Sequence, residues 1–173
     1  PMGAVRELAH VRNVEADLDE CLGDDAAALP RWQKSAEALE AASIAHEAAW
    51  CRLREGRVLA RLGRPDDARE RLEAAREALA RLALPAFCAE AEAWLGSLPG
   101  GDVLRARQAL EKHQGAITPQ AWAAAAQAIG VATADAALLG QARQRLEALI
   151  EAAPEACRAS MRDLPVHARI LEG

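Results

Sequence analysis

The chain has few of the residues from which β-sheets are built. Its 173 residues include no tyrosine and one phenylalanine, and the β-branched residues are scattered. Because strands are enriched in aromatic and β-branched side chains, no run of the sequence predicts a strand. Alanine supplies most of the hydrophobic share of 51%, and alanine has the highest helix propensity of all residues. The composition therefore predicts an all-α protein.

An excess of basic residues is also missing. The formal net charge is −5 and the isoelectric point is about 5.4. Both values argue against a nucleic-acid partner, whose phosphates require a positively charged face. No apolar stretch approaches the roughly 20 residues that a helix needs to cross a bilayer, so we expect no membrane partner. No signal peptide is visible, and we interpret Pro1-Met2-Gly3 as a cloning remnant or an excised boundary.

The cysteines form no C-x-x-C pair. The four residues are widely spaced along the chain, at Cys21, Cys51, Cys88 and Cys157. A helical chain of this size does not need disulfides for its stability, so we expect reduced and mostly buried thiols. This expectation favours a cytoplasmic protein.

Motifs of catalysis, metal binding and phosphate binding are missing as well. His46-Glu47 begins like the zinc motif H-E-x-x-H, but Trp50 occupies the position of the second ligand. Gly100-Gly101-Asp102 has no lysine to hold a phosphate. The acidic residues between 15 and 25 lack the spacing and the internal glycine of a calcium loop. We therefore expect a protein that is not an enzyme and takes no metal or cofactor.

Glycine and proline divide the rest of the chain into helices. Hydrophobic residues at spacings of three and four predict one buried face for each helix, and Ser43 is the expected N-cap of the third. The expected helices span residues 4–22, 26–42, 44–62, 65–82, 85–98, 102–114, 119–129, 132–153 and 154–162, followed by a short turn from Pro165. Consecutive helices with short connections must pack as antiparallel neighbours. The sequence therefore predicts antiparallel hairpins stacked as an α-solenoid.

Pro99-Gly100-Gly101 is the strongest break in the chain. It separates helical hairpins in residues 1–99 from residues 100–173. We interpret the second part as degenerate repeats or capping helices that pack continuously with the first, because the break is too short for a linker.

Residues 48–80 contain two amphipathic helices that resemble the tetratricopeptide repeat (TPR), whose period is about 34 residues. Gly56 falls on the small-residue position of the first helix, where the two helices approach closely. The residues that match the following positions of the repeat are Leu59, Gly63, Ala68, Leu72 and Ala75. Glu55 departs from the pattern, since a core leucine is usual there, and Ala80 replaces the closing proline.

A narrower resemblance covers residues 29–98. The segments Leu29-PRWQKSAEALEA and Ala48-AAWCRLREGRVLARLGRPDDA look like the C-terminal repeat region of large LuxR-type, ATP-dependent bacterial transcriptional regulators. In that family the region is a regulatory helical array between an ATPase and a DNA-binding domain. The resemblance implies only the array, as a signalling or transcription-regulating segment. Leu138-LGQARQRLEALIEAAP resembles the same repeats weakly.

The repeat geometry places one face of the helix 44–62 toward a concave groove. The side chains expected there are Trp50, Leu53, Arg57, Ala60 and Arg61, with Arg54 at the edge. Tryptophan supplies contact area, and arginine offers a planar fork for carboxylates, so these residues predict a site for an acidic or C-terminal peptide segment. In the alternative interpretation, Trp50 belongs to the core and the arginines pair with Glu47 or other nearby acids.

Two functions follow from these patterns. The first is a protein–protein interaction module that acts as an adaptor or regulatory segment. The second is a structural domain that forms a homodimer through an exposed apolar face of a terminal helix, because the ends of a solenoid must be polar or covered. The first helix, with Leu8, Val11, Leu18 and Leu22 on one face, is the expected dimerisation surface.

Overall fold

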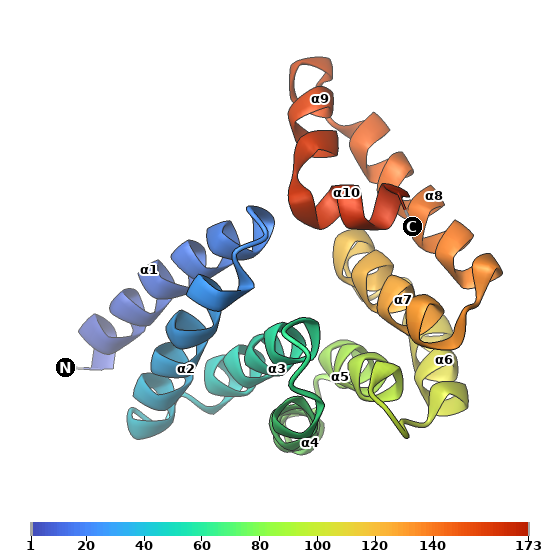
Figure 1. Cartoon of the computed structure of the whole chain (residues 1–173). Coiled ribbons are helices and arrows are strands. Elements are labelled where there is room, and N and C mark those ends of the chain that lie inside the picture. Colours follow the sequence, from blue (N-terminus) through green and yellow to red (C-terminus); the bar gives the residue numbers. More distant parts are fainter. Residues whose placement is uncertain (1, 173) are drawn as a thin grey trace.

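The computed structural model describes residues 2–172, so Pro1 of the expected remnant lies outside the described residues. The chain forms consecutive helices, and residues 2–172 contain no strand, which confirms the all-α prediction (Figure 1). The helices are α1 (Met2–Cys21), α2 (Asp25–Ala41), α3 (Ala45–Arg61), α4 (Pro65–Arg81), α5 (Pro85–Ser97), α6 (Val103–Lys112), α7 (Pro119–Thr133), α8 (Ala136–Ala152), α9 (Glu155–Asp163) and α10 (Pro165–Glu172). In this range no helix is both long enough and apolar enough to cross a membrane.

The connections between the first five helices all use the same turn. One residue in each connection takes a left-handed conformation, and these residues are Gly23, Ser43, Gly63 and Ala83, spaced at intervals of 20. The N–H group of the next residue then bonds a carbonyl five positions earlier, as in Arg64 to Leu59 at 3.0 Å. This Schellman turn satisfies carbonyl groups that the end of a helix leaves free. Because the turn recurs every 20 residues, the helices between successive turns have the same length, and α2, α3 and α4 each contain 17 residues.

Ser43 does not cap α3, contrary to the prediction. Its φ angle is +59°, and its N–H group bonds the carbonyl of Glu40 at 2.9 Å, so it ends α2. The N-cap of α3 is Ile44, which makes no side-chain capping bond. Ser43 occupies the left-handed turn position that glycine fills after α1 and α3. The helices on both sides fix the geometry of this turn, so the same conformation forms with serine.

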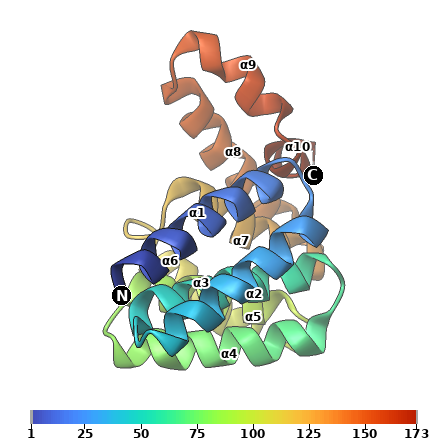
Figure 2. The same ribbon diagram turned by 90° about the vertical axis from the view of Figure 1, so that its left-hand side faces the viewer.

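Each helix packs on the next along an arc (Figure 1). In this view α1, α3, α5 and α7 face the interior of the arc, while α2, α4, α6 and α8 lie outside. Across the break at residues 99–101, α5 packs on both α6 and α7. Figure 2 shows α8 and α9 rising beyond the block formed by α1–α5.

Residues 165–172 form helix α10 rather than the expected short turn. Its side chains His167 and Ile170 are buried, and the helix contacts α7, α8, α9 and, across the arc, α1. Burial of this apolar face stabilises two helical turns that would be marginal in isolation.

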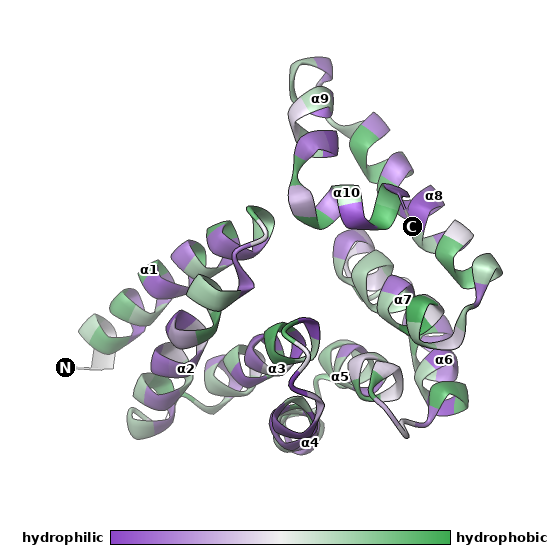
Figure 3. Cartoon of the chain, viewed as in Figure 1, coloured by the Kyte–Doolittle hydropathy of each residue, from purple (hydrophilic) through white to green (hydrophobic). Residues whose placement is uncertain are grey.

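Close contact between α3 and α4 depends on Gly56. A Cβ atom at this position would lie 2.6 Å from Cγ of Leu72, and Ala68 is fully buried in the same interface. The expected small-residue contact between these two helices is therefore present. Figure 3 shows that the outer helix α4 is largely hydrophilic while α7 is largely hydrophobic, as their positions in the array require.

Candidate functional site

The inner helices enclose a groove that contains four of the five predicted partner-binding residues. The cavity has a volume of about 410 Å³ and is lined by α1, α3, α5, α7, α10 and the loop before α7. Helix α3 contributes Trp50, Arg54, Arg57 and Arg61, and the residues that face them from α5 include Phe87 and Glu90. We call this cavity the inner groove.

At one end of the inner groove, a guanidinium group lies between two indole rings. The rings of Trp32 and Trp50 meet edge to face, with centroids 5.2 Å apart and planes at 87°. The Cζ atom of Arg54 lies 5.1 Å and 5.4 Å from the two centroids. Such contacts are worth more when the cation is desolvated. Burial lowers the pKa of Arg54, and the like charge of Arg57 adds to this effect, but an ion pair with Asp17 of α1 and the ring faces favour the cation.

The centre of the groove is an ion network organised by Glu20 of α1. This buried carboxylate accepts hydrogen bonds from Nε1 of Trp32 at 2.8 Å, from Arg57 at 2.6 Å and from Arg61 at 2.5 Å. The donors come from α2 and α3, so a single side chain joins three helices. A buried carboxylate that accepts several charged hydrogen bonds is held in one geometry.

Asp25 at the start of α2 extends the network. Arg61 donates to both of its carboxylate oxygens, with Nη2 to Oδ1 at 2.6 Å and Nε to Oδ2 at 3.0 Å, and Arg169 of α10 lies 3.4 Å away. Burial acts to raise the pKa of Asp25, but the hydrogen bonds and positive charges of Arg61 and Arg169 outweigh it, so the pKa lies below its ordinary value. These contacts join α10 to the first turn of α2.

Glu90 of α5 is the least satisfied carboxylate of the groove. Its Oε1 atom lies 3.6 Å from Nη1 of Arg57, and it has no hydrogen-bond partner among the described residues. Nε of Arg54 and Nε of Arg57 are likewise without partners in this part of the chain. All three atoms are buried, so the groove holds one acceptor and two donors whose hydrogen bonds are not made within the described residues.

The positive charges of the groove are already balanced. The four arginines Arg54, Arg57, Arg61 and Arg169 face the four carboxylates Asp17, Glu20, Asp25 and Glu90. This matches the alternative interpretation of the sequence, in which nearby acids pair with the arginines. Glu47, which that interpretation named, instead pairs with Arg6 at 2.6 Å. Trp50 is half-buried and borders the groove as well as the core.

Leu53 differs from the other predicted residues, because its side chain is fully buried. It belongs to the core and does not face the inner groove. Phe87 and Glu90 face the groove but were not predicted. The signal that could have indicated them is the sole phenylalanine of the chain, three residues before an acid on a helix that is otherwise mostly apolar.

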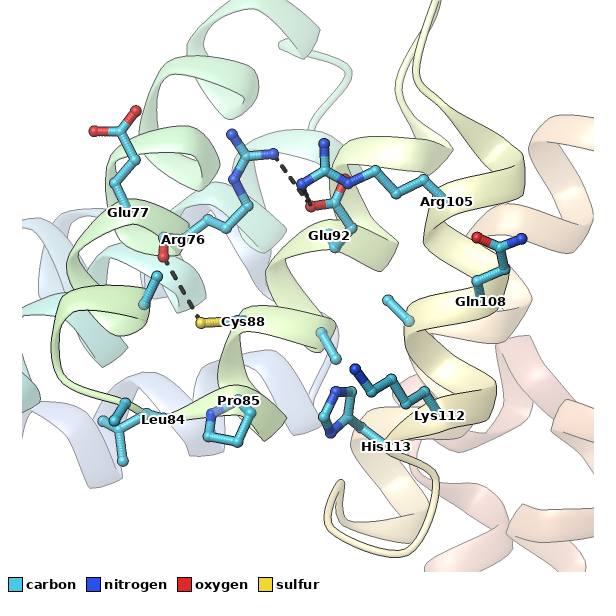
Figure 4. Close-up of a pocket in the computed structure, with 14 residues that line it drawn as sticks. Arg76, Glu77, Leu84, Pro85, Cys88, Glu92, Arg105, Gln108, Lys112 and His113 are labelled. Atoms are coloured by element: carbon cyan, nitrogen blue, oxygen red, sulfur yellow. Dashed lines mark hydrogen bonds and ion pairs between the residues drawn. The ribbon is translucent and has the colours of Figure 1, made fainter.

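A second cavity, of about 780 Å³, lies between α4, α5 and α6 (Figure 4). At one end Arg76 and Arg105 reach the same Glu92 carboxylate at 3.1 Å and 3.0 Å. In its floor the Cys88 thiol points to the carbonyl oxygen of Arg76 at 3.7 Å, and burial raises the pKa of this thiol. The thiol is therefore a weak nucleophile at neutral pH.

Within residues 2–172, no cluster of histidine, cysteine, aspartate or glutamate has the arrangement of a metal site. All four cysteines are free thiols. Only Cys51 is buried and Cys157 is exposed, so the expectation of mostly buried thiols is wrong.

No known protein family, curated protein or solved structure matches this chain.

Proposed function

We propose that the chain is a TPR-like helical repeat module, stacked as an α-solenoid, that binds a peptide or protein segment in the inner groove and does not act as an enzyme. Its place would be a regulatory or adaptor segment of a larger bacterial signalling or transcription-regulating protein in the cytoplasm, as the resemblance to LuxR-type regulators implies. The observation that carries the proposal is a cavity built from four successive inner helices whose polar side chains are held in place by buried carboxylates. A rigid site of this kind loses little entropy when it binds.

The repeat differs in length from the family it resembles. Helices α3 and α5 begin at Ala45 and Pro85, 40 residues apart, whereas the TPR period is about 34 residues. The small-residue contact at Gly56 and the alternation of inner and outer helices support a TPR-like array with longer helices.

The charge balance of the groove shapes the partner that it would accept. An acidic segment would have to compete with Glu20 and Asp25 for Arg57 and Arg61, so carboxylates contribute less than the sequence alone indicates. Apolar side chains of a partner would pack against Trp50 and Phe87, which line the groove. Aromatic anchors of this kind dominate the binding energy of many interfaces.

Selection from a phage-displayed peptide library tests the proposal. A peptide selected on the wild-type protein should bind Phe87→Ser at least about tenfold more weakly, because this ring is half exposed and its loss removes about 1.4 kcal/mol or more of contact energy. Leu104→Ser is the matched control, since Leu104 is an exposed apolar residue on the outer helix α6. Fluorescence anisotropy with the synthetic peptide gives the affinities. Equal binding to all three proteins would exclude the inner groove as the site.

A further inference from the structure

Helix α1 carries an apolar stripe that nothing within residues 2–172 covers. The stripe consists of Leu8, Val11, Val14, Leu18 and Leu22, whose exposed fractions lie between 50% and 58%. The opposite face of the same helix, with Ala9, Asn13, Ala16 and Glu20, is buried. Isolated exposed leucines are common on protein surfaces, but a contiguous row marks an interaction site.

The stripe has equivalents in the next two inner helices. Because the helices recur at 40 residues, Leu8, Val11 and Leu18 correspond to Ala48, Cys51 and Val58 of α3, and to Cys88, Ala91 and Leu98 of α5. On α3 all three residues are buried, and on α5 Ala91 and Leu98 are buried and Cys88 half-buried. These three positions therefore recur, and only on α1 are all of them exposed; Val14 and Leu22 correspond to Arg54 and to the exposed Leu62.

The preceding hairpin covers this face in the two later copies. On α3 the Cys51 thiol points to Oδ1 of Asn13 of α1 at 3.5 Å, and Glu55 accepts from Gln33 of α2 at 3.2 Å. On α5 the Cys88 thiol contacts Arg76 of α4. In each case the outer helix that packs there precedes the inner one and runs antiparallel to it. The stripe on α1 is thus the face that packing covers in the two later copies.

We propose that a second copy of this chain covers the stripe, with α1 packed antiparallel on the partner's α1 about a two-fold axis near Glu15. Head-to-tail stacking would need an apolar surface at the other end of the array. Among the described residues, the other exposed large hydrophobic side chains are Leu62, Leu82, Phe87, Leu104 and Val131, and none of them lies in α8, α9 or α10. Self-pairing is the arrangement that brings two such stripes together, and it closes as a dimer.

The antiparallel orientation would form charge pairs beside the stripe, while the two Glu15 carboxylates, each paired with its own Arg31 at 2.5 Å, would meet near the axis. Arg12 and Asp19 lie on the same edge of the stripe, on either side of its midpoint. A two-fold axis near Glu15 places Arg12 of one copy opposite the equivalent aspartate of the other, twice in each dimer. Asp19 accepts one hydrogen bond from Arg31 at 2.7 Å, and its carboxylate retains acceptor sites for a second donor.

Sedimentation velocity tests the dimer on the whole chain. The measurement covers about 1 to 200 µM protein, a range that suits an interface at the small end of the usual size distribution. We expect a reversible dimer for the wild type and a monomer for Leu18→Asp, with an unchanged melting temperature because the side chain is exposed. Leu104→Ser on α6 is the control and should dimerise like the wild type. A wild type that stays monomeric over this range would overturn the proposal.

A charge exchange tests the orientation separately. Arg12→Asp and Asp19→Arg should each weaken the dimer several-fold, and the double variant should restore it. If Leu18→Asp abolishes the dimer but the double variant does not restore it, the antiparallel arrangement is wrong. The substitutions that test the dimer lie on α1, whereas Phe87, which tests peptide binding, lies on α5 in the inner groove. Failure of the dimer therefore leaves the proposal of peptide binding untouched.

Discussion

The two halves of the molecule are held together by different interactions. In α1–α5 the buried polar residues include Glu20, Asp25, Glu55, Arg57, Glu90 and Glu92, whereas the buried polar side chain assigned to residues 103–172 is His167. The contacts of α7 with α5 and α8 instead use Ala123, Ala126, Ile129 and Gly130. Buried charge therefore adds to apolar and small-residue packing in the first half, as at Gly56, whereas the second half relies on apolar packing with little buried charge.

The helix starts show the same difference. Helices α3, α4 and α5 begin without a side-chain cap. Helices α6, α7 and α8 begin at Asp102, Thr118 and Asp135, each of which accepts a backbone hydrogen bond. A uniform turn spaces α1–α5, where α2 is capped by Asp24 but α3, α4 and α5 are not, whereas a side-chain cap fixes the starts of α6, α7 and α8 but not of α9. Similar packing of helices can therefore rest on different physical terms, which different substitutions should reveal.

The largest expected effect is the loss of a buried carboxylate in the first half. Glu20→Ala would leave Arg57 and Arg61 with a missing partner, and we expect the free energy of unfolding to fall by about 3–5 kcal/mol. Urea denaturation followed by circular dichroism measures the change. Glu151→Ala is the matched control in the second half, because this carboxylate pairs with Arg158 and Arg162 at the surface, and it should leave the urea midpoint unchanged. Equal effects of the two variants would show that buried charge does not distinguish the two halves.

The second half should respond to added volume. A Cβ atom at Gly130 would lie 2.8 Å from Cγ of Leu139, whereas a Cβ atom at Gly140 would meet nothing within 4 Å. Gly130→Ala should destabilise by about 1–3 kcal/mol through overpacking. Gly140→Ala should stabilise by up to about 1 kcal/mol through helix propensity. Thermal unfolding distinguishes the two, and stabilisation by both substitutions would mean that α7 and α8 are not in close contact.

One feature should respond equally in both halves. Ala83 and Ala134 have φ angles of +55° and +54°, and in each case the next N–H group bonds a carbonyl five positions back. Glycine adopts this conformation without the steric cost of a Cβ atom, so Ala83→Gly and Ala134→Gly should each stabilise by about 1 kcal/mol. Gly63→Ala, at an equivalent turn, should destabilise by a similar amount. Opposite signs for the two alanine variants would show that the turns are not equivalent.

The smallest expected effect is the acid sensitivity contributed by Asp25. Its pKa in the folded protein is below the ordinary value of 3.8, so its contribution to stability is present above that value. The contribution is lost as the pH falls through the folded pKa. Chemical denaturation between pH 5 and pH 2 should show a weaker pH dependence for Asp25→Asn than for the wild type. An unchanged slope would indicate that Arg61 and Arg169 do not stabilise the ionised carboxylate.

Glycine and proline mark most helix ends in the sequence, but the predicted end of α7 at Ile129 is wrong, because Gly130 lies inside this helix and α7 runs to Thr133. Thr118-Pro119 begins α7 as expected, and Gly23 ends the turn after α1 in a left-handed conformation. Ser43 was misassigned because serine usually caps a helix start, and only its spacing of 20 residues from Gly23 and Gly63 indicates the turn. The C-terminal helix was underestimated because its stability comes from contacts with α8 and α1, which local sequence does not reveal.

The inner groove was predicted less completely. The face of α3 that carries Trp50, Arg57 and Arg61 follows from helical periodicity, which does not decide whether an arginine is free or paired. The partners of Arg57 and Arg61 lie 36 to 41 positions away in sequence, so the charge balance depends on how the helices cross. Helical periodicity also predicts Leu53 in the groove, but its side chain is fully buried in the core, because neighbouring helices cover that part of α3.

The cation held between Trp32 and Trp50 gives the protein an optical reporter of its own. A molecule that enters the inner groove beside Trp50 must shift or replace Arg54, and the emission spectrum of that indole should change with it. Trp94 and Trp122, both buried and outside the residues that line the groove, would supply a constant background. Occupancy could then be followed by light alone, without a dye or a label.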